Sequence, residues 1–270
     1  MTMPEELIVR VVTRMIDIHC HILPNVDDGP DHVELSLAMA RQAADEGITH
    51  IIATPHHRNG RFDNAKADIL REVQKLNERL EEENIPVTIL PGQETRINGD
   101  MLADYESGNI LTLNNTDRYV FVEFPPNDVP AYAAHLLFDL KMKGLVPVIV
   151  HPERNRAIME KPNRLYRLIK DGSLSQVTAA SIVGKFGKKI QEFSLELIEH
   201  SLVHFIASDA HNVTSRAFHM RAAYREITKE FGYDVADEFQ TNAIRVMNGE
   251  DIYIDEPVEF RRKKKRFRFF

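Results

Sequence analysis

Metal-binding residue types follow six short apolar segments of the chain, at the point where each segment ends. His19 and His21 follow the first segment, and Asp209 and His211 follow the last with the same spacing. The remaining segments end in His56 and His57, in Glu94, in Glu123 and in His151. Imidazole and carboxylate groups without thiolate suit manganese, iron or zinc, and suit magnesium less well. The pattern predicts a metal centre.

The spacing of His19 and His21 predicts how their side chains point. Side chains alternate faces along a strand, so the two histidines share a face and Cys20 points away. A histidine on a strand is more often a hydrogen-bonded core residue, and one such pair is weak support for a metal. The repeated spacing at Asp209 and His211 makes metal binding the favoured interpretation.

The supply of candidate ligands exceeds what one metal ion needs. Glu94 and Glu123 end apolar strands, where a buried carboxylate is costly unless it pairs with a charge or a metal. A carboxylate can bridge two cations, so we expect a multinuclear site. Such sites catalyse displacement at phosphorus, with one metal generating hydroxide and the others holding phosphoryl oxygens. Arg154 and Arg216 could bind phosphate or protonate a leaving group, and the alternative is that they form surface salt bridges.

Several neighbouring residues are ambiguous or argue against other chemistry. In the turn Asn-Val-Asp-Asp-Gly-Pro, spacing does not decide whether Asp27 or Asp28 reaches a metal. A cysteine phosphatase needs an arginine six residues after its nucleophile, and Val26 stands there relative to Cys20. The sequence contains no phosphate-binding loop, nucleophile elbow or H-E-x-x-H motif. A structural role is expected for six other histidines: His32, His50, His135, His200, His204 and His219.

The candidate ligands must be positioned by secondary-structure elements, and predicted strands and helices alternate along the chain. Strands are predicted over residues 15–18, 50–53, 87–90, 119–122, 146–150, 176–178 and 203–207. Helices are predicted over residues 31–46, 66–83, 131–143, 162–171 and 188–200, with a weaker one over 98–106 and one or two in 216–249. Seven such units favour a closed α/β structure, a (β/α)7-type barrel, over an open sheet. Active sites of such barrels lie at the carboxyl ends of the strands, where the candidate ligands would converge.

Composition narrows the class of protein. The chain has 270 residues, 43% of them hydrophobic, and a net charge of −7, which disfavours a nucleic-acid-binding protein or a nuclease. Its longest apolar runs, such as residues 145–150, are far shorter than the ~20 residues of a membrane span. Cys20 is the single cysteine, which excludes an internal disulfide framework and suggests a reducing, cytoplasmic compartment.

The two ends differ from the single domain expected over residues 15–255. Residues 1–14 lack the order of a secretory signal, and we expect them to lie outside the core. Residues 256–270 form a basic tail whose last ten positions hold seven Lys or Arg and three Phe, which leaves −14 on the other 260 residues. The tail is either a solvated end or a cationic patch for an anionic membrane surface or a partner.

Six runs of sequence together resemble the PHP (polymerase and histidinol phosphatase) superfamily. They are MIDIHCHILPNVDDGP, ATPHHRNG, LPGQE, VEFP, VIVHPERNR and ASDAHN. DDGP, HPER and SDAHN resemble in particular the bacterial manganese-dependent tyrosine-protein phosphatases of capsule and exopolysaccharide synthesis. The resemblance extends from Met15 to about Gly249 and implies a distorted barrel, the PHP fold, with three metal ions.

The resemblance also implies how the ligands divide among the metals. The first metal would be held by His19, His21, Glu94 and Asp209. Glu94 would bridge to a second metal held with Glu123 and His151. The third would be held by Asp28, His56 and His211. Manganese is the implied ion, with iron, zinc, magnesium or cobalt as substitutes, and Arg154 and Arg216 match arginines that bind phosphate and assist the leaving group.

The implied function is hydrolysis of phosphotyrosine in proteins, chiefly a membrane-associated bacterial tyrosine kinase and its substrates. This places the protein in the cytoplasm, with peripheral contact at the inner membrane face through the basic tail. One alternative is a small-molecule phosphatase of the histidinol-phosphate type. Another is a non-catalytic module that docks on the kinase, although its complete ligand set favours catalysis.

Overall fold

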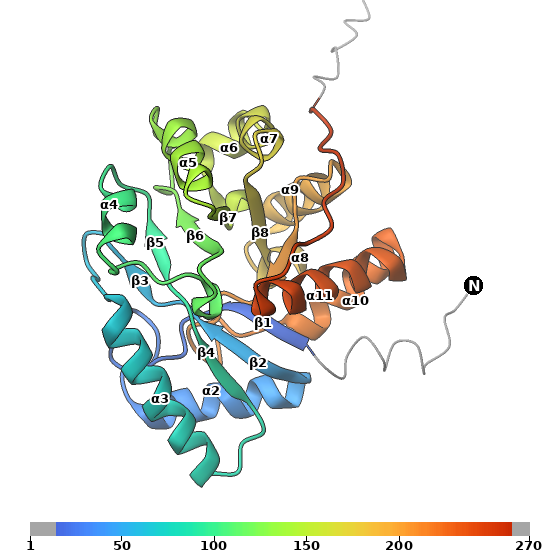
Figure 1. Cartoon of the computed structure of the whole chain (residues 1–270). Coiled ribbons are helices and arrows are strands. Elements are labelled where there is room, and N and C mark those ends of the chain that lie inside the picture. The colour runs from blue at the N-terminus through green and yellow to red at the C-terminus, as the bar shows by residue number, and fades with distance from the viewer. Residues whose placement is uncertain (1–14, 261–270) are drawn as a thin grey trace, which may run out of the picture.

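The computed structural model describes residues 15–260. The N-terminal segment 1–14 and the tail residues 261–270 lie outside the described residues, and with them the roles predicted for both ends. Helices surround a core of parallel strands, and the described chain ends beside α7 and α9 (Figure 1). Within residues 15–260, no helix is long and apolar enough to cross a membrane.

The strands form two sheets in which every pairing is parallel. The first sheet has the order β1 (Met15–Cys20), β2 (Ile48–Ala53) and β4 (Thr88–Pro91). The second has the order β3 (His56–His57), β5 (Glu94–Arg96), β6 (Tyr119–Glu123), β7 (Val146–Val150), β8 (Leu174–Thr178) and β9 (Phe205–Ala207).

The two sheets are parts of one barrel. Only Thr54 and Pro55 separate β2 from β3, and two residues including Gly92 separate β4 from β5, so each pair continues one strand position across a break. At the other edge, the Asp209 amide donates to His19 O at 2.8 Å and the His21 amide donates to Ala210 O at 2.9 Å. These bonds join the first strand to the last. The expected distorted (β/α)7 barrel is confirmed.

The expected helices are present, with small changes in their bounds. They are α2 (Val33–Glu46), α3 (Lys66–Glu82), α4 (Met101–Glu106), α5 (Ala133–Met142), α7 (Asn163–Lys170), α9 (Lys188–Glu199), α10 (Met220–Phe231) and α11 (Tyr233–Asn248). Sequence periodicity missed the shorter elements α6 (Arg156–Glu160), α8 (Ala179–Ile182), and the 3-10 turns η1 (Leu113–Asn115) and η2 (Pro152–Arg154). Segments of three to five residues span too few turns to show a helical period.

Apolar side chains fill the barrel below the carboxyl ends of the strands. Ile18, Ile52, Phe121, Val148 and Phe205 belong to one buried cluster in the barrel. That cluster continues onto Leu113 of η1 and Val246 of α11. A second and larger cluster lies between the strands and the surrounding helices. The packed interior leaves the polar residues at the strand ends as the place where a ligand can enter.

The last described residues return along the domain surface. The Val258 amide donates to His200 O at 2.9 Å, and the Phe260 ring stacks on the His200 ring at 3.9 Å between centroids. The Asn163 side chain accepts from the Phe260 amide at 2.9 Å and donates to its carbonyl at 3.0 Å. Residues 256–260, which the sequence assigned to the tail, therefore contact α7 and the end of α9.

Candidate metal centre

All nine predicted ligands lie in one cluster at the carboxyl ends of the strands. Within the described residues, three groups of side chains bring their ligand atoms within 4.8 Å of one another. The groups are His21, Asp28, His56 and His211; His19, His21 and Glu94; and His56, Glu94 and Glu123.

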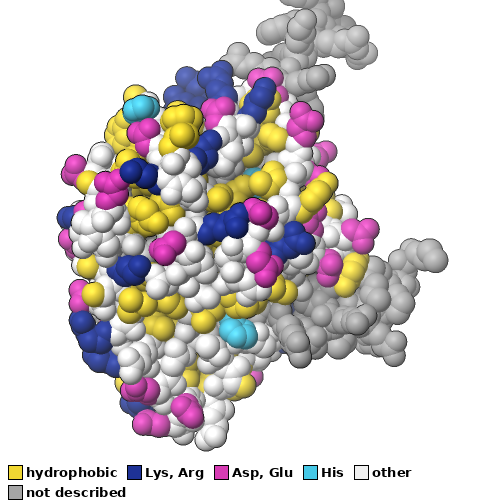
Figure 2. Space-filling model, viewed as in Figure 1, with side chains coloured by type: hydrophobic (Ala, Val, Ile, Leu, Met, Phe, Trp, Pro, Cys, Tyr) yellow, Lys and Arg dark blue, Asp and Glu magenta, His cyan; other side chains and the backbone are white. Residues whose placement is uncertain are grey.

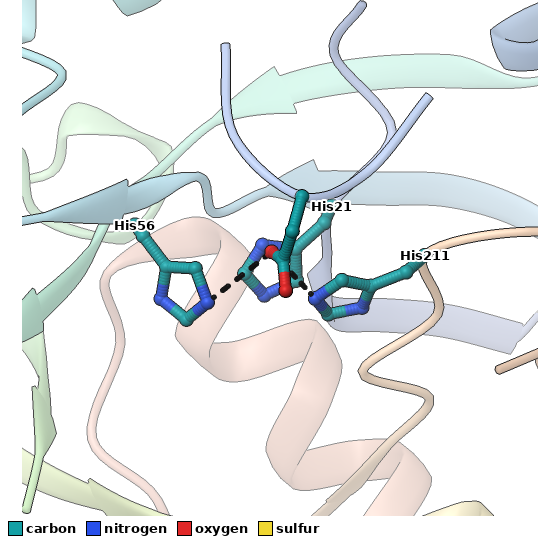
Figure 3. A group of neighbouring side chains, drawn as sticks. His21, His56 and His211 are labelled. Carbon is teal, nitrogen blue, oxygen red and sulfur yellow. Dashed lines mark ion pairs between the residues drawn. The ribbon is translucent and has the colours of Figure 1, made fainter. Parts of the chain in front are cut away.

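Asp28 lies between two histidines of the first group. Its Oδ1 atom is 3.4 Å from His56 Nε2 and 3.2 Å from His211 Nε2. Figure 3 shows these two ion pairs as dashed lines, with His21, His56 and His211 converging from different parts of the chain. Asp28 faces the cluster, whereas Asp27 accepts a hydrogen bond from His21 Nδ1, on the side of that ring away from the cluster. Asp28 therefore stays the proposed ligand of the two.

Glu94 is the centre of the other two groups. Its fully buried Oε2 atom is 2.8 Å from His56 Nδ1, 3.3 Å from His21 Nε2 and 3.6 Å from His19 Nε2. Burial would raise the pKa of Glu94, but the histidines His56, His19 and His151 hold it well below its usual range. Glu94 is therefore an anion surrounded by several histidine nitrogens.

His151 and Asp209 lie at the side of these groups. His151 Nε2 is 2.7 Å from Glu94 Oε1. Asp209 Oδ1 is 3.5 Å from His19 Nε2 and 3.4 Å from His21 Nε2. The groups differ in detail from the division that the resemblance implies, since His21 also joins Asp28 and His56 also joins Glu123.

The hydrogen bonds of two histidines direct their free nitrogens into the cluster. His19 Nδ1 donates to Gln176 Oε1 at 2.8 Å, and His21 Nδ1 donates to Asp27 Oδ2 at 2.6 Å. The Nε2 atoms of His19 and His21 then face each other at 3.3 Å. A second hydrogen bond of this kind is how proteins fix the tautomer of a metal-binding histidine.

The cluster is suited to a cation. Burial would lower the pKa of His21, but Asp27, Asp209 and Glu94 together raise it well above its usual value. His56 Nδ1, Glu94 Oε2 and His211 Nε2 are buried within ion-pair distance of one another or of Asp28, yet none of them makes a hydrogen bond of good geometry. These donors fit a metal ion, whose binding displaces protons from its ligands.

Two further histidines are kept neutral by burial, which lowers the pKa of His151 and of His211 to about 4. A neutral imidazole is the form that binds a metal. Glu123 behaves in the opposite way, since burial and the charge of Glu94 raise its pKa to about 7. Arg96 compensates with two hydrogen bonds of 2.9 Å to the Glu123 carboxylate.

The two predicted arginines both reach the cluster. Arg154 donates to Asp209 Oδ2 at 2.5 Å, and Arg216 donates to the same oxygen at 3.2 Å. Arg216 also lies 3.5 Å from Asp28 Oδ2, and the guanidinium of Arg154 lies over the Phe186 ring at 5.4 Å. The two side chains are 23% and 32% exposed, so neither forms an ordinary surface salt bridge.

A cavity of about 270 Å³ opens beside the metal-ligand residues. Its lining includes the polar residues Glu123, His151, Arg154 and Arg216. It also includes the apolar residues Phe124, Pro126, Val150 and Pro152. Charged and apolar residues in one lining suit a ligand that carries an anion on an aromatic ring.

The backbone is in the left-handed region at two residues of the site. His151 has φ of 37° and Asp209 has φ of 52°. Residues other than glycine rarely adopt this conformation, and when they do the surrounding structure must hold them there. His151 directly follows β7, and Asp209 lies two residues after the end of β9.

Sequence reasoning missed the residues that orient the ligands. Gln176 belongs to β8, the one predicted strand that ends in no metal-binding residue type, and its position there could have drawn attention to it. Asp17 lies two residues before His19 and accepts hydrogen bonds from the amides of Ser208 and His19. Nothing in the sequence indicated a role for Arg96, because its contact with Glu123 depends on the pairing of β5 with β6. The six histidines expected to be structural lie outside the three ligand groups.

Residues 15–248 match the family described as capsular polysaccharide synthesis, CpsB/CapC. Tyrosine-protein phosphatase YwqE of Bacillus subtilis is 47% identical over 95% of this chain and the whole of that protein. Tyrosine-protein phosphatase CpsB of Streptococcus pneumoniae is 33% identical over 83% of this chain and 94% of that protein.

The fold agrees with these similarities. A crystal structure from work on YwqE of Bacillus subtilis and CpsB of Streptococcus pneumoniae, described as metal-dependent tyrosine phosphatases, matches with a TM-score of 0.90. The match has 47% identity and covers 92% of this chain and all of that one. Fold and site thus define a metal-binding β/α barrel protein. The chain belongs to the CpsB/CapC family of capsular polysaccharide synthesis.

Proposed function

We propose that this protein is a manganese-dependent tyrosine-protein phosphatase with three metal ions. Its substrates are phosphotyrosine residues of a membrane-associated bacterial tyrosine kinase and of that kinase's own substrates, on the cytoplasmic side of the membrane. One observation supports this most strongly. Residues of the imidazole and carboxylate cluster line a cavity together with two arginines and several apolar residues.

The nine clustered residues would hold the metal ions, with Glu94 contributing to more than one of them because both of its oxygens face histidines. When bound, the ions activate a water molecule for attack on phosphorus and neutralise phosphoryl oxygens. Nitrogen and oxygen donors without thiolate are compatible with manganese, and also with iron, zinc, cobalt or magnesium. The ligands are His19, His21, Asp28, His56, Glu94, Glu123, His151, Asp209 and His211.

Arg154 and Arg216 bind the phosphoryl group in this proposal. Both guanidinium groups converge on Asp209 and line the cavity, so an entering phosphate competes for donors that are already in place. Guanidinium groups suit phosphate because they offer several donors in a fixed plane. Arg216 also lies 3.5 Å from Asp28, and in this proposal it assists the departing phenolate.

The apolar residues of the cavity favour an aromatic leaving group over an aliphatic one in this proposal. Phe124, Pro126, Val150 and Pro152 offer surface to a phenyl ring. A histidinol phosphate would leave these residues in contact with a more polar group, which is the reason to rank small-molecule phosphatase second. A non-catalytic docking module has no use for two arginines converging on the metal-ligand cluster.

A direct comparison of substrates tests the proposal. With manganese added, we expect turnover of a phosphotyrosyl peptide to exceed that of a matched phosphoseryl peptide and of histidinol phosphate. Preferred turnover of histidinol phosphate would replace the proposal with the small-molecule alternative. Absence of turnover with all three, from protein that binds manganese, would favour the docking module.

A further inference from the structure

A second and larger cavity, which we call the α6–α7 groove, is lined by residues of α6 and α7 and by Phe260. It has a volume of about 580 Å³. Three basic residues, Lys161, Arg164 and Arg167, line it together with Glu160, Asn163 and Phe260. Figure 2 shows Lys and Arg side chains gathered at the top of the view, in the region of α6 and α7.

The basic side chains of the α6–α7 groove are largely unneutralised. The carboxylate of Glu160 already accepts from Arg156 at 2.9 Å. Arg164 is 4.0 Å from Asp128, at the limit of an ion pair. Within residues 15–260, no carboxylate lies within ion-pair distance of Lys161 or Arg167, and both side chains are exposed. The groove therefore presents a positive surface on a protein whose net charge is −7.

The last described residue lies in the groove. Phe260 lines it and is fixed by two hydrogen bonds to Asn163 and by stacking on His200.

The groove is close to the proposed active site along the chain. Asn155 lines the active-site cavity and Glu160 lines the groove, with only α6 between them. A helix of this length spans about 8 Å, at about 1.5 Å per residue. An extended peptide covers the same distance in about two to three residues. A substrate segment of a few residues is long enough to span this distance.

We propose that the α6–α7 groove binds acidic or phosphorylated residues that flank the target phosphotyrosine in the same protein substrate. The inference rests on the proposed phosphatase function and adds what the enzyme recognises around its target. A concave basic groove suits side chains that enter it, whereas a membrane surface needs a face that can lie against a plane. Exposed charges of this kind mainly affect association and depend on salt.

Charge-reversal variants of the full-length protein test the groove. The double variant Lys161→Glu, Arg167→Glu alters its lining. The control Lys170→Glu, Lys189→Glu changes net charge equally at two exposed lysines that do not line it. Two phosphotyrosyl peptides are compared, one with Asp or Glu within about four residues of the target and one with Asn or Gln at those positions. The readouts are kcat and KM with each peptide and with a small aryl phosphate, all with manganese.

We expect the groove variant to raise KM for the acidic peptide about tenfold, with kcat and aryl phosphate turnover unchanged. KM for the neutral peptide should change less than twofold, and the control should match the wild type with both peptides. An equal effect on the two peptides, or the same loss in the control, overturns the proposal.

Two binding measurements separate the other outcomes. An acidic peptide without phosphotyrosine should bind the wild type in a salt-dependent way and bind the groove variant more weakly. This result can hold even if phosphotyrosyl peptides are not hydrolysed, in which case the proposed function fails and the groove remains. If the groove variant loses binding to anionic phospholipid vesicles but binds the acidic peptide normally, the groove is a membrane contact and the proposal is wrong.

Discussion

Asp27 shows how much of the site depends on residues that do not face the metal-ligand space. Its carboxylate accepts from His21 Nδ1 at 2.6 Å, from the Gly29 amide at 2.9 Å and from the His56 amide at 3.1 Å. One side chain thus fixes the ring of one proposed ligand and the backbone of another. Burial would raise the pKa of Asp27, but His21 holds it below its usual value, so the group stays ionised.

Substitution of Asp27 should therefore impair metal binding without removing a ligand. We expect Asp27→Asn to weaken manganese affinity or turnover by about 10- to 100-fold, as loss of a carboxylate behind a histidine ligand does elsewhere. The control is Asp31→Asn, whose side chain is 82% exposed and lies outside the cluster. Manganese titration followed by phosphotyrosine turnover measures both quantities. Equal behaviour of the two variants would show that Asp27 has no orienting role.

Eight of the nine candidate ligands could be predicted because each one follows an apolar strand, and parallel strands end at the same side of a barrel. The choice between Asp27 and Asp28 could not, because it depends on how the turn folds back over His21 and His211. Arg96 and Gln176 were missed for a related reason. Arg96 contacts a residue 27 positions away, and Gln176 contacts one 157 positions away. A single sequence does not reveal such pairs.

Tight turns between elements hold the ligands in place. Gly29 ends the Asp-Asp-Gly turn, and a β-carbon at this position would lie 2.3 Å from the backbone oxygen of His21. Backbone cannot move aside as a flexible side chain can. The turn that carries Asp28 can thus pack against β1 only with glycine here.

Replacement of this glycine should damage the site more than the fold. We expect Gly29→Ala to lower turnover more than about tenfold and to reduce the free energy of unfolding by about 1–3 kcal/mol, the usual cost of overpacking. Gly99→Ala is the matched control, because a β-carbon there meets no atom within 4 Å. Turnover assays and urea denaturation measure the two effects. Wild-type turnover in Gly29→Ala would refute the close contact.

The free energy of unfolding should depend on pH through His204, which is not one of the proposed metal ligands. It immediately precedes β9, accepts from the Ser175 amide at Nδ1, and burial lowers its pKa to about 4. Its unfolded pKa is about 6.5, so the unfolded state binds the proton first as the pH falls. The folded state should therefore lose about 3 kcal/mol from this group between pH 6.5 and pH 4.

The variant His204→Asn removes the titrating group and keeps an acceptor for Ser175. We expect the wild type to lose more free energy of unfolding than this variant when the pH falls from 7 to 5, measured by urea denaturation at each pH. Parallel losses in both proteins would show that His204 titrates normally in the folded state.

At the scale of the whole molecule, the alternation of strand and helix patterns along the sequence predicted the barrel. It did not predict the breaks within the barrel. Pro55 and Gly92 interrupt two strand positions and divide the sheet into groups of three and six strands. The first break lies directly before His56 and the second just before Glu94, so the distortion occurs where the proposed ligands must turn inward. Short apolar runs do not reveal such breaks, because each half still has a strand pattern.

Metal binding should also stabilise the molecule, because the ligand cluster exists only in the folded chain. A ligand that binds only the folded state adds about 2.7 kcal/mol at 100 times its Kd. We therefore expect manganese to raise the Tm of chelator-treated protein, and His19→Ala to reduce that shift. Calorimetry with and without manganese measures it. An unchanged Tm in the wild type would contradict metal binding by the cluster.

The most direct measurement is hydrolysis of a phosphotyrosyl peptide by full-length protein, before and after metal is removed with a chelator and manganese is restored. Our account predicts that turnover is lost with the chelator, returns with manganese, and falls by orders of magnitude in Asp209→Ala at the same metal concentration. Full turnover by protein shown to be free of metal would contradict it.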